Sequence, residues 1–175
     1  MKKFLFISML ITVGLIICNC SKKDNKTSNT NTNGPVNGTY NASGTITFTA
    51  GGVNYSCPFA KVIAASTSLT IQTSTENVKT NGSIIVTCYT ATSAITTGTY
   101  TASSAETISS VSFVDKNVTP YTSTAITSGS SCTVNITSLT STSIKGTFTA
   151  TVFKPIDNSS VSITDGVIDC TITSK

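Results

Sequence analysis

Apolar residues alternate with threonine or serine along most of the chain after residue 42. The segment Thr45–Ala50 reads Thr-Ile-Thr-Phe-Thr-Ala, and Ile144–Val152 continues the same pattern at greater length. A period of two places apolar side chains on one face of a β-strand and hydroxyls on the other, which is typical of half-buried antiparallel strands. Threonine suits the wetted face because it is β-branched and polar. No segment after residue 42 shows a helical periodicity.

The alternation explains why the chain is so rich in threonine and serine. The chain has 175 residues, of which 35 are threonine and 26 are serine, and only 10% are charged. The average for globular proteins is roughly 25% charged residues. Without periodicity such a chain would be a candidate disordered stalk, but here most of the threonine is expected on the outer face of sheets.

Nine or ten strands are predicted from this period and from the turn residues between the apolar runs. They cover residues 44–50, 53–59, 67–73, 83–90, 98–102, 108–114, 121–126, 131–139, 143–153 and 160–173. Short strands at this spacing are typical of an antiparallel β-sandwich or a flattened β-barrel. We therefore expect one all-β domain over residues 43–175.

The pair Gly51-Gly52 is a hairpin signal between two alternating runs. A two-residue loop there sets Phe48 opposite Tyr55 and Ile46 opposite Cys57, all on the apolar phase. Pattern and register therefore agree for the first hairpin.

Two other residue pairs that contain a glycine mark irregular points of the predicted sheet. Asn81-Gly82 is expected to be a second turn of the same kind. Around Asp165-Gly166 the apolar phase shifts by one residue, which predicts a β-bulge with Gly166 at positive φ.

The N-terminus has the parts of an export signal. Two lysines precede the apolar run Phe4–Ile17, which is short for a membrane-spanning helix of roughly 20 residues. The run ends at Cys18-Asn19-Cys20, and polar residues follow immediately. This segment resembles bacterial lipoprotein signals, in particular those of Bacteroidota. Cys20 is the candidate lipidation residue, with Cys18 as runner-up, and the alternative is an ordinary cleaved signal with two incidental cysteines.

Residues 1–19 are thus expected to be the signal peptide, and residues 20–42 a lipid-anchored flexible linker. That linker has few large apolar groups and cannot bury enough surface to offset its ordering entropy. A lipoprotein cysteine carries several acyl chains, and more than one chain gives stable attachment. The expected location is the bacterial cell envelope, at the outer membrane, on its periplasmic or surface face.

Four cysteines fall on the apolar phase of predicted strands. They are Cys57, Cys88, Cys132 and Cys170. An exported chain with an even number of cysteines favours disulfides, so two intradomain bridges are expected, with three connectivities open. The alternative is that the four are buried unpaired thiols that act as small hydrophobic residues.

The second half of the chain carries two structural motifs, Ile-x-Gly-Thr-Phe and Val-x-Ile-Thr-x-Gly. The residues concerned are Ile144, Gly146, Thr147, Phe148, Val161, Ile163, Thr164 and Gly166. With the earlier element Gly98–Tyr100, they resemble small lipoprotein domains of unknown function from Bacteroidota. The resemblance implies an envelope lipoprotein of β architecture and brings no activity with it.

Missing residue types exclude several functions. The chain has no histidine and no arginine, so it has neither an imidazole base nor bidentate phosphate contacts. A net charge of +4 on so few charged groups is too weak for a nucleic-acid groove. Asp165 and Asp169 are the best candidates for a catalytic pair of carboxylates. Asp157 and Asp165 are the best candidates for calcium ligands. Turn acids are more often solvated, so no enzyme activity, cofactor or metal is expected.

Binding is the remaining class of function. Ile85, Tyr89 and Phe153 lie on the outward phase of their strands, and Tyr121 is expected to be exposed near a strand start. Exposed aromatic rings stack on sugars or contact protein partners. The expected function is a lipid-anchored structural or interaction domain, and the alternative is a surface-exposed glycan- or ligand-binding lipoprotein. A contiguous aromatic patch would distinguish the two.

Overall fold

The computed structural model describes residues 37–102, 107–123 and 129–174, and it confirms the all-β prediction. These residues form ten strands and one short helix. The bounds are β1 Gly38–Ala50, β2 Val53–Ala65, β3 Ser68–Thr73, α1 Val78–Asn81, β4 Ser83–Thr90, β5 Gly98–Thr101, β6 Thr107–Val114, β7 Pro120–Thr122, β8 Ser131–Leu139, β9 Ser143–Phe153 and β10 Ser160–Ser174.

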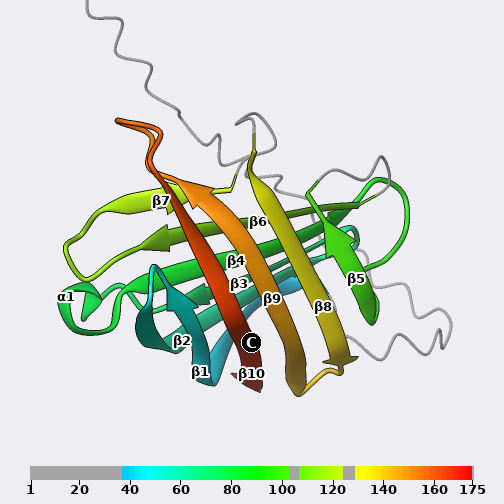
Figure 1. Ribbon diagram of the computed structural model, residues 1–175. Helices are drawn as coiled ribbons and strands as arrows, with labels where there is room; N and C mark the ends of the chain where they lie inside the picture. The colour runs from blue at the N-terminus through cyan, green and yellow to red at the C-terminus, as the bar shows by residue number, and fades with distance from the viewer. Residues whose placement is uncertain (1–36, 103–106, 124–128, 175) are drawn as a thin grey trace, which may run out of the picture. The chain divides into compact units, whose positions relative to one another are not determined.

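The strands form one continuous antiparallel sheet that curls back on itself (Figure 1). Its order is β10-β1-β2-β3-β4-β6-β7-β9, and β9 pairs with β10, so eight strands close a barrel. β8 and β5 extend the sheet from β9. The closure between β7 and β9 rests on a single pair, Thr122 with Phe153, while β9 and β10 pair over most of their length. The flattened barrel is thus tightly paired on one side and nearly open on the other.

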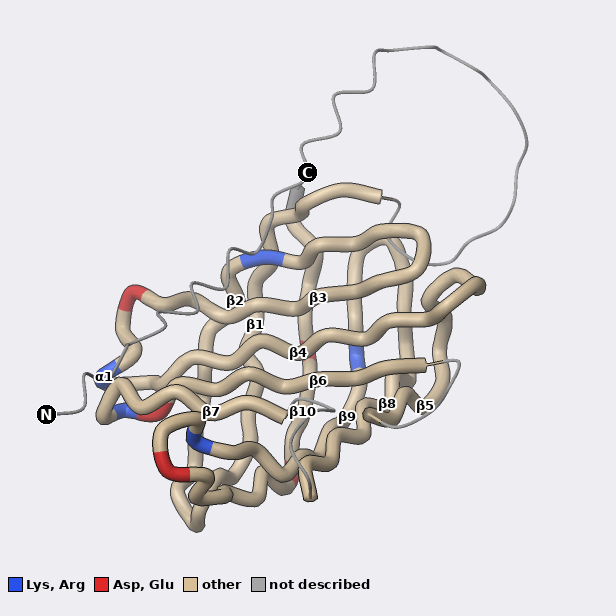
Figure 2. Tube along the Cα trace, turned by 90° about the horizontal axis from the view of Figure 1, so that it is seen from above, with Lys and Arg blue, Asp and Glu red and all other residues tan. Residues whose placement is uncertain are grey.

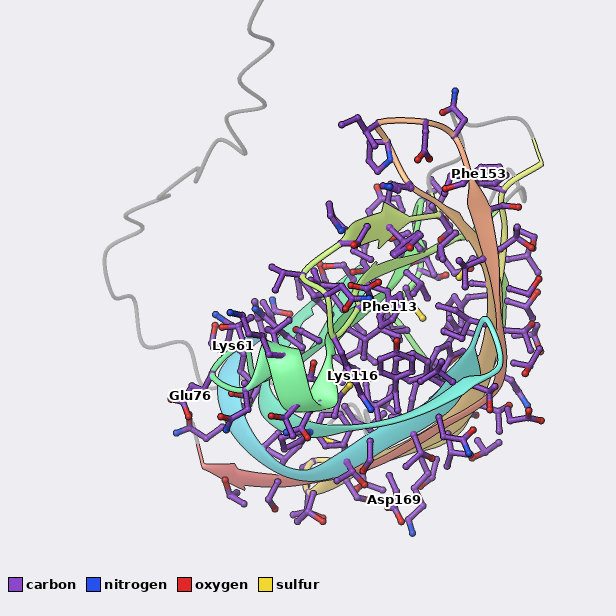
Figure 3. The ribbon with its side chains drawn as sticks, turned by 60° about the vertical axis from the view of Figure 1, so that its left-hand side comes forward. Lys61, Glu76, Phe113, Lys116, Phe153 and Asp169 are labelled. Atoms are coloured by element: carbon purple, nitrogen blue, oxygen red, sulfur yellow. The ribbon has the colours of Figure 1, made fainter. Side chains whose placement is uncertain are left out.

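One apolar core fills the barrel, built from the inward phase of almost every strand. Four aromatic rings form its centre: Phe48, Tyr55, Phe113 and Phe148. Figure 3 shows Phe113 pointing into the space between the layers. Threonine lies mainly outside this core, as predicted. Among the described threonines, Thr73 and Thr90 alone are buried.

The first strand begins earlier than its apolar pattern indicates. β1 starts at Gly38, so the last residues of the expected linker pair with β2, and Tyr40 is buried opposite Val62. The pattern is hidden because the register shifts between Asn41 and Thr45. Gly44 lies in that gap at φ 105°, and a Cβ there would stand 2.3 Å from the Asp169 carbonyl oxygen.

The first hairpin is as predicted, and the second turn is not. Phe48 pairs with Tyr55 and Ile46 with Cys57, and the two rings of the first pair stack at 5.0 Å. Asn81-Gly82, by contrast, ends the helical turn α1. Gly82 has φ 71° and donates its N–H to the Val78 carbonyl at 2.7 Å, a common way to end a helix.

The bulge in β10 is present, but its left-handed residue is not Gly166. The register of β10 with β9 shifts between Ile163 and Gly166, and Asp165 has φ 54°. Aspartate tolerates this conformation better than most residues. Gly166 is needed for a different reason, because a Cβ there would lie 2.4 Å from the Phe148 carbonyl oxygen.

Candidate functional site

The charged residues of the barrel gather at the end that carries α1 (Figure 2). Six of the ten in the described segments lie there, in the connections 74–82, 115–119 and 154–159. They are Glu76, Lys79, Asp115, Lys116, Lys154 and Asp157. We call this end of the barrel the α1 mouth. Its three lysines and three acids balance, so the mouth is strongly polar without a net charge.

Two of these connections are fixed by their acids. In the 115–119 turn, Asp115 Oδ1 accepts the N–H of Asn117 at 2.9 Å and that of Thr119 at 2.7 Å. The turn holds Lys116 Nζ 5.0 Å from the centre of the Tyr55 ring, a cation–π contact. Burial and the Asp115 charge raise the pKa of Tyr55.

The 154–159 turn is held by a second acid. Asp157 accepts the hydroxyl of Ser159 at 2.6 Å and forms an ion pair with Lys154 at 3.0 Å. The Ser159 hydrogen bonds, and then the Lys154 bond, lower the pKa of Asp157 to about 2. The turn is therefore anionic at Asp157 and cationic at Lys154 across the physiological pH range.

An apolar hollow of about 250 Å³ opens at the α1 mouth. Strands β4, β6 and β7 supply most of its lining, and the flanking turns supply the rest. The lining residues are Thr75, Ser83, Ile85, Ser112, Phe113, Val114, Pro120, Tyr121, Thr122 and Pro155. Tyr121 is half-buried and stacks on Phe113 at 5.7 Å. The hollow therefore borders one ring of the aromatic core, and its lining includes no charged side chain.

The three predicted binding aromatics do not form one patch. Tyr89, 39% exposed, lies at the opposite end of β4 from the residues that line the hollow. Phe153 is half-buried at the end of β9, and Tyr121 packs against the core from the inward phase, so its expected exposure is corrected. Of the three, Tyr121 alone lines the hollow. In the sequence, this end of the barrel could have been found from the charged residues, because six of them cluster in three connections between strands.

The predicted acid pairs are also separated from the hollow. Asp169 forms an exposed ion pair with Lys145 at 3.3 Å and lies on the outside of the barrel in Figure 3. Asp165 is exposed and accepts the Thr164 hydroxyl at 2.9 Å. Neither lines the hollow. Within the described segments, no three Cys, Asp or Glu side chains gather in a way that would hold a metal ion.

All four core cysteines are buried, as their phase predicts, and all four are free thiols in this structure. The expectation of two bridges is therefore not met. Register explains part of this. A whole strand separates Cys57 from Cys88, Cys57 from Cys170, and Cys132 from Cys170. Two strand spacings are roughly 10 Å, beyond the roughly 7 Å that a disulfide spans between Cα atoms.

The lipidation candidates Cys18 and Cys20, and the expected signal peptide, lie outside the described residues. Among the described residues there is no helix with the length and apolar character needed to cross a membrane. No family model matches the chain, and comparison with curated proteins and with solved structures found no similar protein.

Proposed function

We propose that this chain is a lipid-anchored domain of the bacterial cell envelope with a non-enzymatic interaction role. The observation that carries the proposal is Cys20, which follows a basic and apolar signal and precedes a polar segment. The likeness to Bacteroidota lipoprotein signals supports the same placement. The barrel begins at Gly38, 18 positions after Cys20. A chain of that length spans at most about 60 Å, so the barrel would stay near the membrane surface.

The anchor is tested by replacing Cys20 with Ala in the full chain and following labelled palmitate and membrane fractionation. Cys18→Ala is the matched control, because it removes a cysteine two positions away. Labelling should be lost in the first variant and kept in the second. Unchanged labelling of Cys20→Ala would refute Cys20 as the anchor.

A second candidate function is ligand binding in the hollow at the α1 mouth. Ligand pockets are commonly about 300–1,000 Å³ and mostly apolar, so a hollow of about 250 Å³ suits one ring or one branched aliphatic group. The balanced charges of the rim favour a partner that carries this group next to polar atoms of both signs. The separation of Tyr89, Tyr121 and Phe153 weighs against an extended glycan platform.

This second function is tested with an apolar fluorescent probe of the anilinonaphthalene class. Tyr121→Ala changes the wall of the hollow, whereas Tyr89→Ala removes an exposed tyrosine far from it. Probe binding should weaken several-fold in the first variant and stay unchanged in the second. Equal binding by both variants would exclude the hollow as the site.

A further inference from the structure

The outward face of β2, β3, β4 and β6 carries three exposed apolar side chains at one end. Ile63, Tyr89 and Ile108 are 38%, 39% and 46% exposed. Tyr89 is the register partner of Ile108 across β4 and β6, so these two side chains are neighbours. The register connects Ile63 through β3 to Thr87, two residues before Tyr89 on β4. All three apolar side chains therefore stand on the same side of the sheet.

The charge on these four strands has one sign. Lys61 is the one charged residue within the bounds of β2, β3, β4 and β6. It lies two positions before Ile63, on the same side of β2, and neither ion pair of the described residues involves it. We call Lys61, Ile63, Tyr89 and Ile108 the Tyr89 face. This face combines exposed apolar groups with a single cation.

The described chain enters the barrel beside this face. β1 begins at Gly38, and the next residue, Thr39, pairs with Ile63. Tyr89 lies at the end of β4 farthest from α1, because α1 leads directly into the start of that strand. Figure 2 shows the turn between β2 and β3 at the opposite end of the barrel from α1. A tether that joins the barrel at Gly38 therefore arrives at the Tyr89 face, and the α1 mouth lies at the other end.

Both ends of the barrel expose apolar groups, but their charges differ. Ile156, in the 154–159 turn of the α1 mouth, is 84% exposed. The same end carries the acids Glu76, Asp115 and Asp157, which anionic lipid heads repel, whereas the Tyr89 face carries only a lysine, which they attract. The apolar side chains of the Tyr89 face stand on an open sheet and line no part of the hollow. They therefore suit an extended surface and not a small molecule.

We infer that the Tyr89 face docks on the lipid surface to which the chain is anchored. The inference rests on the proposed anchor at Cys20 and adds an orientation, with the α1 mouth directed away from the membrane. Tyrosine favours the boundary between lipid heads and acyl chains, where its ring is buried and its hydroxyl stays hydrated. The two isoleucines add apolar area, and Lys61 meets the lipid phosphates. The tether makes this contact intramolecular, so a small face is enough to hold the orientation.

The orientation can be tested directly because the chain has no tryptophan. A full-length Cys18→Ala chain is coupled through Cys20 to a maleimide phospholipid in vesicles of phosphatidylethanolamine and phosphatidylglycerol with brominated acyl chains. The four core cysteines are at most 2% exposed and do not compete for the maleimide. Bromine should quench the emission of Tyr89→Trp several-fold more strongly than that of the matched control Ile156→Trp. Equal quenching, no quenching, or stronger quenching of Ile156→Trp would overturn the inference.

Two charge variants test the part played by Lys61. In the Tyr89→Trp chain, Lys61→Gln should reduce the quenching. Lys145→Gln should leave it unchanged, because it removes an exposed lysine outside the four strands. Equal quenching in both variants would refute the contact between Lys61 and lipid phosphate.

The coupling also separates this inference from the proposed anchor. Because the maleimide lipid replaces the acyl chains, a chain that fails the palmitate test still reports on the Tyr89 face. A chain that passes the palmitate test but shows no quenching keeps its anchor and loses the proposed orientation. Without vesicles, a blue shift of the Tyr89→Trp emission that grows with protein concentration would show that a second copy covers the face. That result would also overturn the inference.

Discussion

Gly166→Ala is the substitution with the sharpest structural consequence. Gly166 is buried in β10 opposite Phe148, and its φ is ordinary for any residue. The added Cβ would stand 2.4 Å from the Phe148 carbonyl oxygen and 2.6 Å from its ring. A contact of 3.4 Å is ordinary, so β9 and β10 would have to separate locally by about 1 Å.

Two effects set the magnitude. Overpacking of this kind costs about 1–3 kcal/mol, and a weakened backbone hydrogen bond adds about 1 kcal/mol. Phe148 also lies 6.0 Å from Phe48 in the aromatic core, so its ring cannot move freely. We expect Gly166→Ala to lower the free energy of unfolding by about 2–4 kcal/mol, or the melting temperature by roughly 10 °C for a domain of this size.

Thermal unfolding followed by circular dichroism measures this effect. Gly52→Ala is the control, because Gly52 has φ 79° but no atom within 4 Å of its Cβ position, which leaves about 1–2 kcal/mol of backbone strain. Asp165→Gly should be neutral or stabilising, since it relieves the positive φ. A Gly166→Ala variant no less stable than Gly52→Ala would refute the close-contact explanation.

Three further predictions concern the core and its titrating groups. Phe113→Ala should cost about 3–5 kcal/mol in chemical denaturation, because this buried ring contacts three other aromatic rings. A loss below 1 kcal/mol would contradict the assigned core. Ser159→Ala should raise the pKa of Asp157 from about 2 towards 3.8 in an NMR titration, and an unchanged midpoint would exclude the hydroxyl as its main cause. Burial raises the pKa of Cys57 to about 11 and of Cys88 to about 12, above the 9.0 of an exposed thiol. The stability that the two protonated thiols give the folded state is therefore complete below pH 9. It is lost as the pH rises from 9 through about 11 and about 12. Alanine at either position should make the free energy of unfolding decline less steeply in this alkaline range.

The local alternation of apolar and polar residues was enough to predict where the strands lie. Each of the ten predicted strands overlaps an observed one, and the first hairpin has the predicted register. Both follow from short-range physics, since a period of two defines a buried face and Gly51-Gly52 favours a two-residue turn. The misassigned points are Asn81-Gly82 and Asp165-Gly166. In each the glycine was identified but not its conformation: Gly82 ends a helical turn, and Gly166 lies against Phe148 of β9 with an ordinary φ.

The candidate site was less predictable. The aromatics were predicted from strand phase, yet phase does not say which end of the barrel a residue occupies. Tyr121 and Tyr89 were grouped by that criterion, although Tyr121 stacks on Phe113 and Tyr89 lies at the other end of β4. The hydrogen bond from the Ser109 hydroxyl to the Cys132 carbonyl could not be predicted either, because β6 and β8 do not pair with each other.

The sequence by itself determined an all-β chain with hydroxyls mainly outside and cysteines inside. These are properties of residue type and spacing, so they need no knowledge of distant neighbours. The tertiary structure decided how the sheet closes and which charges share one mouth. Closure depends on strand register summed around the whole barrel, and no single segment carries that information.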